Sequence, residues 1–337
     1  MKYSVVLSIS LLVGIAGRAQ TSDMLAIAPD ARAAALGYAG IATSPDAAAQ
    51  HWNVAKYAFA ENSGGVQFSY TPWMKNIVDG IQLLYASGYK TFGAQAVSAS
   101  LHYFSAGEIE SNNTWTDYTA SPASRAVDLG YARRFGERFS LGVAFRYIAV
   151  DYMERDHAFA LAAAHTIAAD VGACYRLPIA AGEWTFGMAL TNVGGSLDMG
   201  GSRVSLPANI GAGSQFAWRI ADLHRLNLAA DVNKPLSGGT GAAGNRFDLR
   251  MGGGAEYSYA QKIALRAGYY YDDAFGNNRS CLAFGAGLHF YSVCFDIAYW
   301  VTTGQQSVAL NNTLHVTLGY TFPYKSARTD TAPSSVL

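Results

Sequence analysis

The sequence predicts an all-β fold, a 14-stranded antiparallel transmembrane β-barrel with an N-terminal hatch inside its lumen. Three observations support it. Most of the chain after residue 62 alternates apolar with small or polar residues, the connections alternate between long and short, and a segment rich in small residues precedes the first strand. Only 14% of residues are charged, whereas Gly numbers 35 and Tyr 21, which is typical of strands with a lipid face and a lumen face.

Residues 1–19 are predicted to form a secretory signal peptide. Lys2 supplies the positive start, an apolar stretch runs from Val5 to Ala16, and the small residues Gly17 and Ala19 precede the expected cleavage site. This stretch is shorter than the ~20 residues that a spanning helix needs, and no later one reaches that length without Gly or a polar residue. We therefore expect a protein that has left the cytoplasm and crosses a membrane with strands.

Residues 20–61 are predicted to form the hatch. The stretch 26–59 is rich in Ala and Gly, is interrupted by Pro29 and Pro45, and lacks the alternation of the later chain. A barrel of fourteen strands is too wide for its own side chains to fill, so a plug is expected. The candidate hatch residues are Pro29, Asp30, Arg32, Pro45, Asp46, His51, Trp52 and Asn53.

Two alternatives remain for the polar hatch side chains, among them Lys56. They pair with lumen-facing groups such as Arg146, Arg266 and His315, or they are solvated in a water-filled interior.

The barrel is predicted to occupy residues 62–322. In 139–150, for example, Phe139, Leu141 and Val143 fall on one face, while Ser140 and Gly142 fall on the other. Such alternation predicts strands near 63–72, 80–89, 92–104, 125–135, 139–150, 163–176, 183–192, 207–217, 223–233, 247–258, 261–271, 280–290, 293–303 and 311–322.

The connections between these strands sort by length. The long set comprises 73–79, 105–124, 151–162, 193–206, 234–246, 272–279 and 304–310, and most of the others are tight turns. Short turns at one end and long loops at the other are typical of bacterial outer-membrane barrels. We therefore expect a multi-pass protein of the cell outer membrane, with the long loops outside and a flexible periplasmic tail at 323–337.

Several other classes of protein are not supported. Twenty-four basic residues balance 24 acidic ones, and no Gly-rich phosphate loop is present, so nucleic acid is not an expected partner. Cys174, Cys281 and Cys294 cannot all pair within one chain and form no Cys-x-x-Cys spacing, so we assign them no metal and the protein no cofactor.

The small-residue segment carries a family likeness. It resembles the N-terminal segment of the PorV (LptO) family, outer-membrane proteins of the type IX secretion system that belong to the broader FadL-like barrels, which have fourteen strands and an N-terminal hatch. The family's Asn-Pro-Ala pattern is broken because Val54 stands in place of Pro, which predicts a local change in hatch stiffness. The resemblance rests on Ala28-Pro29-Asp30-Ala31-Arg32-Ala33, Gly37, Gly40, Ser44-Pro45-Asp46 and His51-Trp52-Asn53, and extends more weakly to Phe322.

The resemblance implies a function without catalysis. PorV-like proteins bind secreted cargo by its C-terminal signal domain as it leaves the translocon barrel. They deliver it to an attachment complex with a sortase-like protease, where the cargo is joined to lipopolysaccharide or released. The extracellular loops are the expected contact surface, since aromatic residues, Met and Arg are enriched at interfaces. Ordinary packing between loops would explain the same composition. The candidate cargo-binding residues are Trp73, Met74, Trp115, Tyr118, Met153, Arg155 and Met199.

Two rival functions were weighed. A FadL-type channel for uptake of hydrophobic small molecules would need a continuous apolar pocket between hatch and wall. A barrel enzyme such as a lipid deacylase would need a nucleophile beside an oriented base, but the seven His residues are scattered and form no recognisable motif. We therefore predict no enzyme, and retain the channel as the alternative function.

Overall fold

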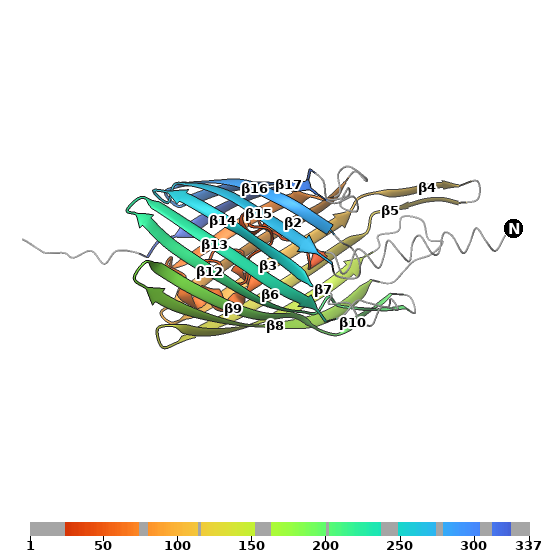
Figure 1. The fold of residues 1–337 in the computed structure, drawn as a ribbon. Coiled ribbons are helices and arrows are strands. Elements are labelled where there is room, and N and C mark those ends of the chain that lie inside the picture. Colours follow the sequence, from red (N-terminus) through yellow and green to blue (C-terminus); the bar gives the residue numbers. More distant parts are fainter. Residues whose placement is uncertain are drawn as a thin grey trace, which may run out of the picture.

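In the part of the chain that the structure describes, fourteen antiparallel strands close into one barrel (Figure 1). The structure is a computed structural model, and it describes residues 24–73, 80–113, 116–151, 163–199, 202–236, 249–273, 279–303 and 312–324. The barrel strands are β1 (Gly64–Pro72), β2 (Ile81–Phe92), β3 (Gln95–Ala106), β6 (Ala123–Phe135), β7 (Phe139–Asp151), β8 (Ala164–Ile179), β9 (Gly182–Gly194), β12 (Asn209–Ala221), β13 (His224–Pro235), β14 (Arg250–Tyr259), β15 (Ile263–Asp272), β16 (Arg279–Phe290), β17 (Val293–Thr302) and β18 (Leu314–Phe322).

The first strand closes the ring. Strand β1 pairs with β2 on one side and with β18 on the other, so that Val66 lies opposite both Gly88 and Tyr320. Every strand is therefore hydrogen-bonded to two neighbours, which leaves no open sheet edge. The predicted fold class is confirmed.

The two faces of the wall differ as the alternation predicts. Along β7, Leu141, Val143 and Phe145 are exposed on the outside, whereas Ser140 and Ala144 are buried on the inside. In a bilayer this outer face contacts lipid, which is why the strands carry apolar residues at every second position. Among the described residues, no helix has the length and apolar character needed to cross a membrane.

Two hairpins occupy connections that were predicted as loops. Strands β4 (Ile109–Asn113) and β5 (Thr116–Ala120) form one within 105–124, and β10 (Ser196–Met199) and β11 (Ser202–Ser205) form the other within 193–206. Both lie at the end of the barrel with the long connections, here called the long-loop end, and β4–β5 extends beyond the rim (Figure 1). The opposite end, with connections such as 180–181, is called the short-turn end.

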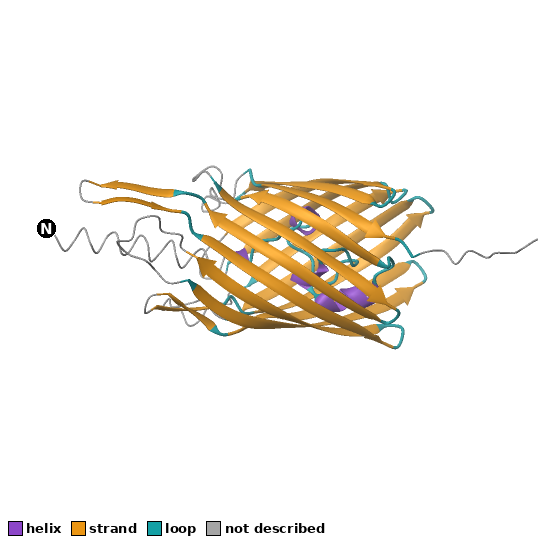
Figure 2. Cartoon of the chain, turned by 180° about the vertical axis from the view of Figure 1, so that it is seen from behind, coloured by secondary structure: helices purple, strands orange, loops and turns teal. Residues whose placement is uncertain are grey.

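The hatch lies inside the barrel. It contains two short helices, α2 (Ala31–Ala35) and α3 (Ala49–Trp52), and the 3-10 helix η1 (Val54–Phe59), all of which are enclosed by the strands (Figure 2). Most of its side chains are buried, from Met24 near the long-loop end to Phe59 near the short-turn end. The expected signal peptide and residues 325–337 of the expected tail lie outside the described residues.

Glycines in the wall let the hatch backbone approach closely. A Cβ atom on Gly142 of β7 would lie 2.7 Å from the Ala55 nitrogen, and one on Gly254 of β14 would lie 2.9 Å from the Leu36 Cα. Real Cβ atoms do not approach other atoms this closely, so the hatch could not seat against larger residues at these positions. The small residues of the hatch and of the barrel wall therefore allow the two to pack closely together.

Candidate functional site

A chain of alternating charges joins the hatch to the wall. Arg32 donates from Nε and Nη2 to the two carboxylate oxygens of Glu256, each at 2.9 Å, and from Nη1 to Asp46 at 3.1 Å. Glu256 also accepts from Nε of Arg266 at 2.6 Å, and Nη1 of Arg266 donates to Asp296 at 2.6 Å. Each of these charges therefore has an opposite partner. The two hydrogen bonds between Arg32 and Glu256 anchor the hatch to β14.

Asp30 ties two parts of the hatch together. Its carboxylate caps α2 by accepting from the Ala33 backbone nitrogen at 2.8 Å, and it accepts from the Trp52 indole at 2.8 Å. Burial, followed by the nearby Asp46 charge, raises the pKa of Asp30 to about 6, although both hydrogen bonds act in the opposite direction. Asp30 thus fixes α2 against α3.

The turn between α2 and α3 is hydrogen-bonded to a hatch residue, Lys56, and to a wall residue, Asp231. The Lys56 ammonium donates to the Gly40 carbonyl at 2.5 Å and to the Thr43 hydroxyl at 3.0 Å. Asp231 of β13 accepts from the Gly40 and Ile41 backbone nitrogens at 2.7 and 2.8 Å. Burial lowers the pKa of Lys56, which costs stability that these hydrogen bonds offset.

Asn53 anchors the end of the hatch. Its side-chain oxygen accepts from the Ala55 nitrogen at 3.1 Å, which caps η1. Its amide nitrogen donates to the Ile41 carbonyl at 3.1 Å and to the Ala173 carbonyl of β8 at 2.9 Å. One side chain therefore connects η1, the hatch turn and the wall.

A second charged cluster lies on the other side of the lumen. The His51 ring stacks on His102 of β3 with centroids 5.6 Å apart, and Nε2 of His102 lies 3.5 Å from Asp128 of β6. Arg146 of β7 bridges Asp128, at 2.5 Å, and Asp170 of β8, at 3.1 Å. Burial, followed by the nearby positive charges, lowers the pKa of His51 well below its usual value, so this imidazole is neutral.

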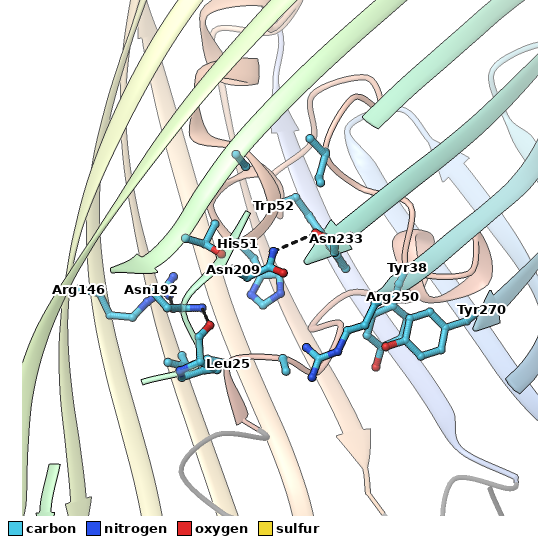
Figure 3. Close-up of a pocket in the computed structure, with 15 residues that line it drawn as sticks. Leu25, Tyr38, His51, Trp52, Arg146, Asn192, Asn209, Asn233, Arg250 and Tyr270 are labelled. Carbon is cyan, nitrogen blue, oxygen red and sulfur yellow. Dashed lines mark hydrogen bonds between the residues drawn. The ribbon is translucent and has the colours of Figure 1, made fainter. Parts of the chain in front are cut away.

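The space between hatch and wall near His51 is small, and its lining mixes polar and apolar side chains. A cavity of about 70 Å³ lies there (Figure 3), whereas a drug-sized ligand needs about 300–1,000 Å³. The cavity fits a few water molecules. The polar groups that line it include Arg146, Asn192, Asn209, Asn233 and Arg250.

A larger cavity opens at the short-turn end. It has a volume of about 910 Å³ and lies below the hatch, between Asp46 and Lys56 of the hatch and wall residues such as Arg176 and Asp296. We call it the vestibule. Its lining mixes polar and apolar side chains, and residues of the hatch form part of its wall.

The structure describes three of the seven candidate cargo-binding residues, and these three lie in different surroundings. Trp73 is only 6% exposed and packs in the apolar cluster at the long-loop end, so it does not present its ring to a partner. Tyr118 lies in β5 opposite Ser111, and Met199 lies in β10 opposite Ser202. Met74, Trp115, Met153 and Arg155 lie outside the described residues.

Hatch side chains do pair with lumen-facing groups of the wall, but the three partners given as examples are not the ones that bind them directly. Arg146 pairs with two wall carboxylates, Arg266 meets the hatch only through the shared Glu256, and Nδ1 of His315 lies 3.0 Å from the Thr71 hydroxyl. The sequence analysis missed Glu256 and Asp231 as the groups that bind the hatch. Each is an acidic residue at an inward position of its strand, a signal that could have identified it.

Comparison with protein families decides the relationship. The family described as "Type IX secretion system protein PorV" matches residues 17–240, which is more than half of the chain. The chain belongs to the PorV family. This membership agrees with the resemblance found in residues 26–59, and it implies partners within the secretion system. No curated protein matches the sequence.

Solved structures similar to this PorV-family protein are FadL-like barrels. The Pseudomonas putida toluene transporter TodX has a TM-score of 0.59 and 12% identity, over 88% of this chain and 99% of that one. The Ralstonia pickettii toluene transporter TbuX has a TM-score of 0.56 and 12% identity, over 88% and 98%. A Pseudomonas aeruginosa FadL homologue has a TM-score of 0.52 and 12% identity, over 88% and 98%. At such low identity these matches establish the shared fold, an outer-membrane β-barrel, and nothing about substrates.

Proposed function

We propose that this protein is a shuttle of the type IX secretion system, which binds the C-terminal signal domain of secreted cargo at its extracellular loops. It then delivers the cargo from the translocon to the sortase-like attachment complex. The observation that carries the proposal is the contrast between a lumen filled by an anchored hatch and a long-loop end that carries two hairpins. A barrel of this kind offers a binding surface at its long-loop end, while its hatch stands between the two ends of the lumen.

The hydrogen bonds between hatch and wall support a function of this protein at its rim, outside the lumen. Arg32, Asn53 and Asp231 connect hatch and wall at three separate places by buried hydrogen bonds. Breaking a buried ion pair costs about 3–5 kcal/mol, so displacing the hatch during each transport cycle would be expensive. Cargo binding at the rim requires no such displacement.

The alternative, uptake of hydrophobic small molecules, has less support. The cavity of about 70 Å³ between hatch and wall lacks the volume of a binding site for such a molecule, and Arg146, Arg250 and three Asn side chains interrupt its apolar lining. The ring of strand pairs is also closed, and among the described strands the register shifts only within β8–β9 and beside the β12–β13 turn. Neither feature favours a lateral path to the membrane.

The β4–β5 hairpin is the proposed primary contact. It extends beyond the rim (Figure 1), so a folded cargo domain can reach both of its sides without touching the barrel wall. Its sequence from Ile109 to Ala120 contains Trp115 and Tyr118, and Trp and Tyr are enriched among the few residues that dominate binding. Met74, Met153, Arg155 and Met199 belong to neighbouring connections and complete the proposed surface.

The test replaces residues 109–120 with a short Gly-Ser turn and measures binding of a purified cargo C-terminal domain to the barrel in mild detergent. We expect Trp115→Ala and Tyr118→Ala each to weaken binding at least tenfold, or about 1.4 kcal/mol, and the hairpin replacement to abolish it. Trp218→Ala, which changes an aromatic on the outer wall surface near the short-turn end, serves as the matched control. A correctly folded barrel that binds cargo equally well without the hairpin would contradict the proposal.

A second experiment tests the partners. The barrel is isolated from its native outer membrane in mild detergent, and everything that accompanies it is identified by mass spectrometry. The proposal predicts secreted proteins that share one C-terminal domain, together with a very large barrel or a sortase-like protease. Recovery of the barrel with a bound fatty acid and none of these proteins would favour the channel.

A further inference from the structure

Three potential metal ligands meet on the wall of the vestibule. His289 of β16 and Cys294 of β17 are direct cross-strand partners, and Asp296 lies two residues further along β17 on the same inward face. One ligand atom from each, an imidazole nitrogen, the thiol sulfur and a carboxylate oxygen, lies within 4.8 Å of the other two. The tight turn that joins the two strands places these side chains at the short-turn end.

The backbone around the three residues leaves room for their side chains to converge. A Cβ on Gly319 of β18 would collide with the Cys294 sulfur, and a Cβ on Gly287 of β16 would collide with a carboxylate oxygen of Asp296. Both ligands therefore lie over glycines of the neighbouring strands, Cys294 over β18 and Asp296 over β16, so no wall side chain covers their ligand atoms there. All three ligand residues also line the vestibule, so an ion can reach them from water.

The ligand set and the surrounding charges suit one metal in particular. We propose that His289, Cys294 and Asp296 bind Zn²⁺, with water from the vestibule in a fourth position. Zinc prefers sulfur, nitrogen and carboxylate oxygen in a tetrahedral arrangement, at about 2.0–2.3 Å from each atom. Ligand atoms around such an ion lie roughly 3.3–3.7 Å apart, so modest side-chain rotations close the observed spacing.

Arg266 orients the carboxylate ligand. It donates from Nη1 to Oδ1 of Asp296 at 2.6 Å, so one oxygen is held while the carboxylate retains a second for the metal. The positive charge of Arg266 is balanced, because its Nε binds Glu256 at 2.6 Å. With Arg32 and Asp46 included, the connected group has three carboxylates and two guanidiniums, and a Cys294 thiolate brings the net charge to −2. A divalent cation neutralises it.

The zinc site is independent of the proposed function. The cysteines were expected to bind no metal, because they form no Cys-x-x-Cys spacing. The sequence does carry a signal for this site. Positions 289 and 294 lie on either side of a two-residue turn, each one residue in from it, and this spacing makes them facing partners in a hairpin. A zinc ion there would fasten the β16–β17 hairpin on the inside of the barrel.

The test uses the full-length barrel with Cys174→Ser and Cys281→Ser, which leaves Cys294 as the single thiol. After treatment with a chelator, the protein is titrated with Co²⁺ in detergent, and zinc is then added. We expect a near-ultraviolet thiolate-to-cobalt absorption band at one equivalent, its loss on adding zinc, and about one zinc per chain by elemental analysis. Folding is checked by heat-modifiable migration in gels.

Matched variants identify the ligands. Cys294→Ser should remove the band, and His289→Gln should weaken metal binding at least tenfold. His224→Gln is the control, because His224 is another His near the short-turn end, where its ring bonds the Tyr257 hydroxyl at 2.7 Å. A folded single-cysteine barrel without the band would overturn the proposal, as would binding that is equally tight in the His289→Gln and His224→Gln variants.

Discussion

Arg32 of the hatch and Glu256 of β14 are 224 residues apart in sequence and are joined by two hydrogen bonds of 2.9 Å each. The pair is largely buried, with 15% and 6% of the two side chains exposed. Its geometry uses both prongs of the guanidinium, which a Lys ammonium cannot reproduce. The position of the hatch in the lumen is therefore set by a specific contact as well as by general packing.

Replacing Arg32 by Met should loosen the hatch. The change leaves Asp46 without the ion pair and Glu256 with Arg266 as its one charged partner, so we expect local opening of the hatch to become easier by about 3 kcal/mol. Amide hydrogen exchange of residues 31–59 in the folded barrel measures this. Arg133→Met is the control, since Arg133 is exposed on the outside of β6, where its guanidinium lies over the Phe135 ring, away from the hatch. Equal exchange in the two variants would contradict the assigned anchor.

Replacing Gly142 by Val should unseat η1. The new side chain would occupy the space of the Ala55 nitrogen, 2.7 Å from an ideal Cβ, and of the Val54 side chain at 2.8 Å. We expect a cost of about 1–3 kcal/mol and faster passage of small solutes through the barrel in a liposome-swelling assay. Val143→Ala, on the lipid-facing side of the same strand, should leave the permeability unchanged. A sealed Gly142→Val barrel would show that hatch and wall do not need this close approach.

Replacing Trp300 by Phe tests a single hydrogen bond. The Trp300 indole donates to the Ala34 carbonyl of α2 at 3.0 Å, and the side chain is fully buried. Phe keeps the aromatic contact with Tyr38 and leaves the carbonyl with the Gly37 backbone nitrogen as its donor at 3.2 Å, so losing the indole hydrogen bond should cost about 0.5–1.5 kcal/mol in α2 stability. Hydrogen exchange of the α2 amides reports the change. Trp184→Phe, at a half-exposed outer position, should leave those amides unaffected.

The hatch should become more stable in mild acid because of Asp30. Its pKa of about 6 in the folded protein exceeds the ordinary value of 3.8, so between these values the folded state binds more protons than the unfolded state. Stability from this group therefore falls as pH rises from about 4 to 6, by roughly 3 kcal/mol in all. Asp30→Asn should remove that part of the pH dependence.

The measurement for Asp30 is hatch exchange at several pH values, corrected for intrinsic rates, in the wild type and in Asp30→Asn. Other carboxylates titrate in both proteins, so the difference between the two curves isolates Asp30. Parallel curves between pH 4 and pH 7 would show that Asp30 has an ordinary pKa.

The fold could be predicted from the sequence because lipid enforces it. Each lipid-facing position must be apolar, so strands such as β7 and β18 carry an alternation that is visible without a structure. The β4–β5 and β10–β11 hairpins are not in contact with lipid, and short polar strands such as Ile109–Asn113 lack this signal. Their pairing depends on backbone hydrogen bonds that composition does not reveal.

The candidate site was predicted in part. The hatch residues were identified because the segment has an unusual composition, and Arg32 does bind the wall. Its partner was not identified, because choosing Glu256 over other inward acids requires knowing which strand passes beside α2 in a closed ring. The cross-strand approach of His289 and Cys294 was missed for the same reason, since it depends on register.

The closed ring has a consequence for what the barrel needs from other chains. Because the backbone of each barrel strand is satisfied by its own neighbours and the outer face is apolar around the circumference, closing the sheet requires no strand from another chain. If the barrel carries cargo, delivery is a two-dimensional search, and its rate scales with how densely the carriers and their destinations populate the membrane.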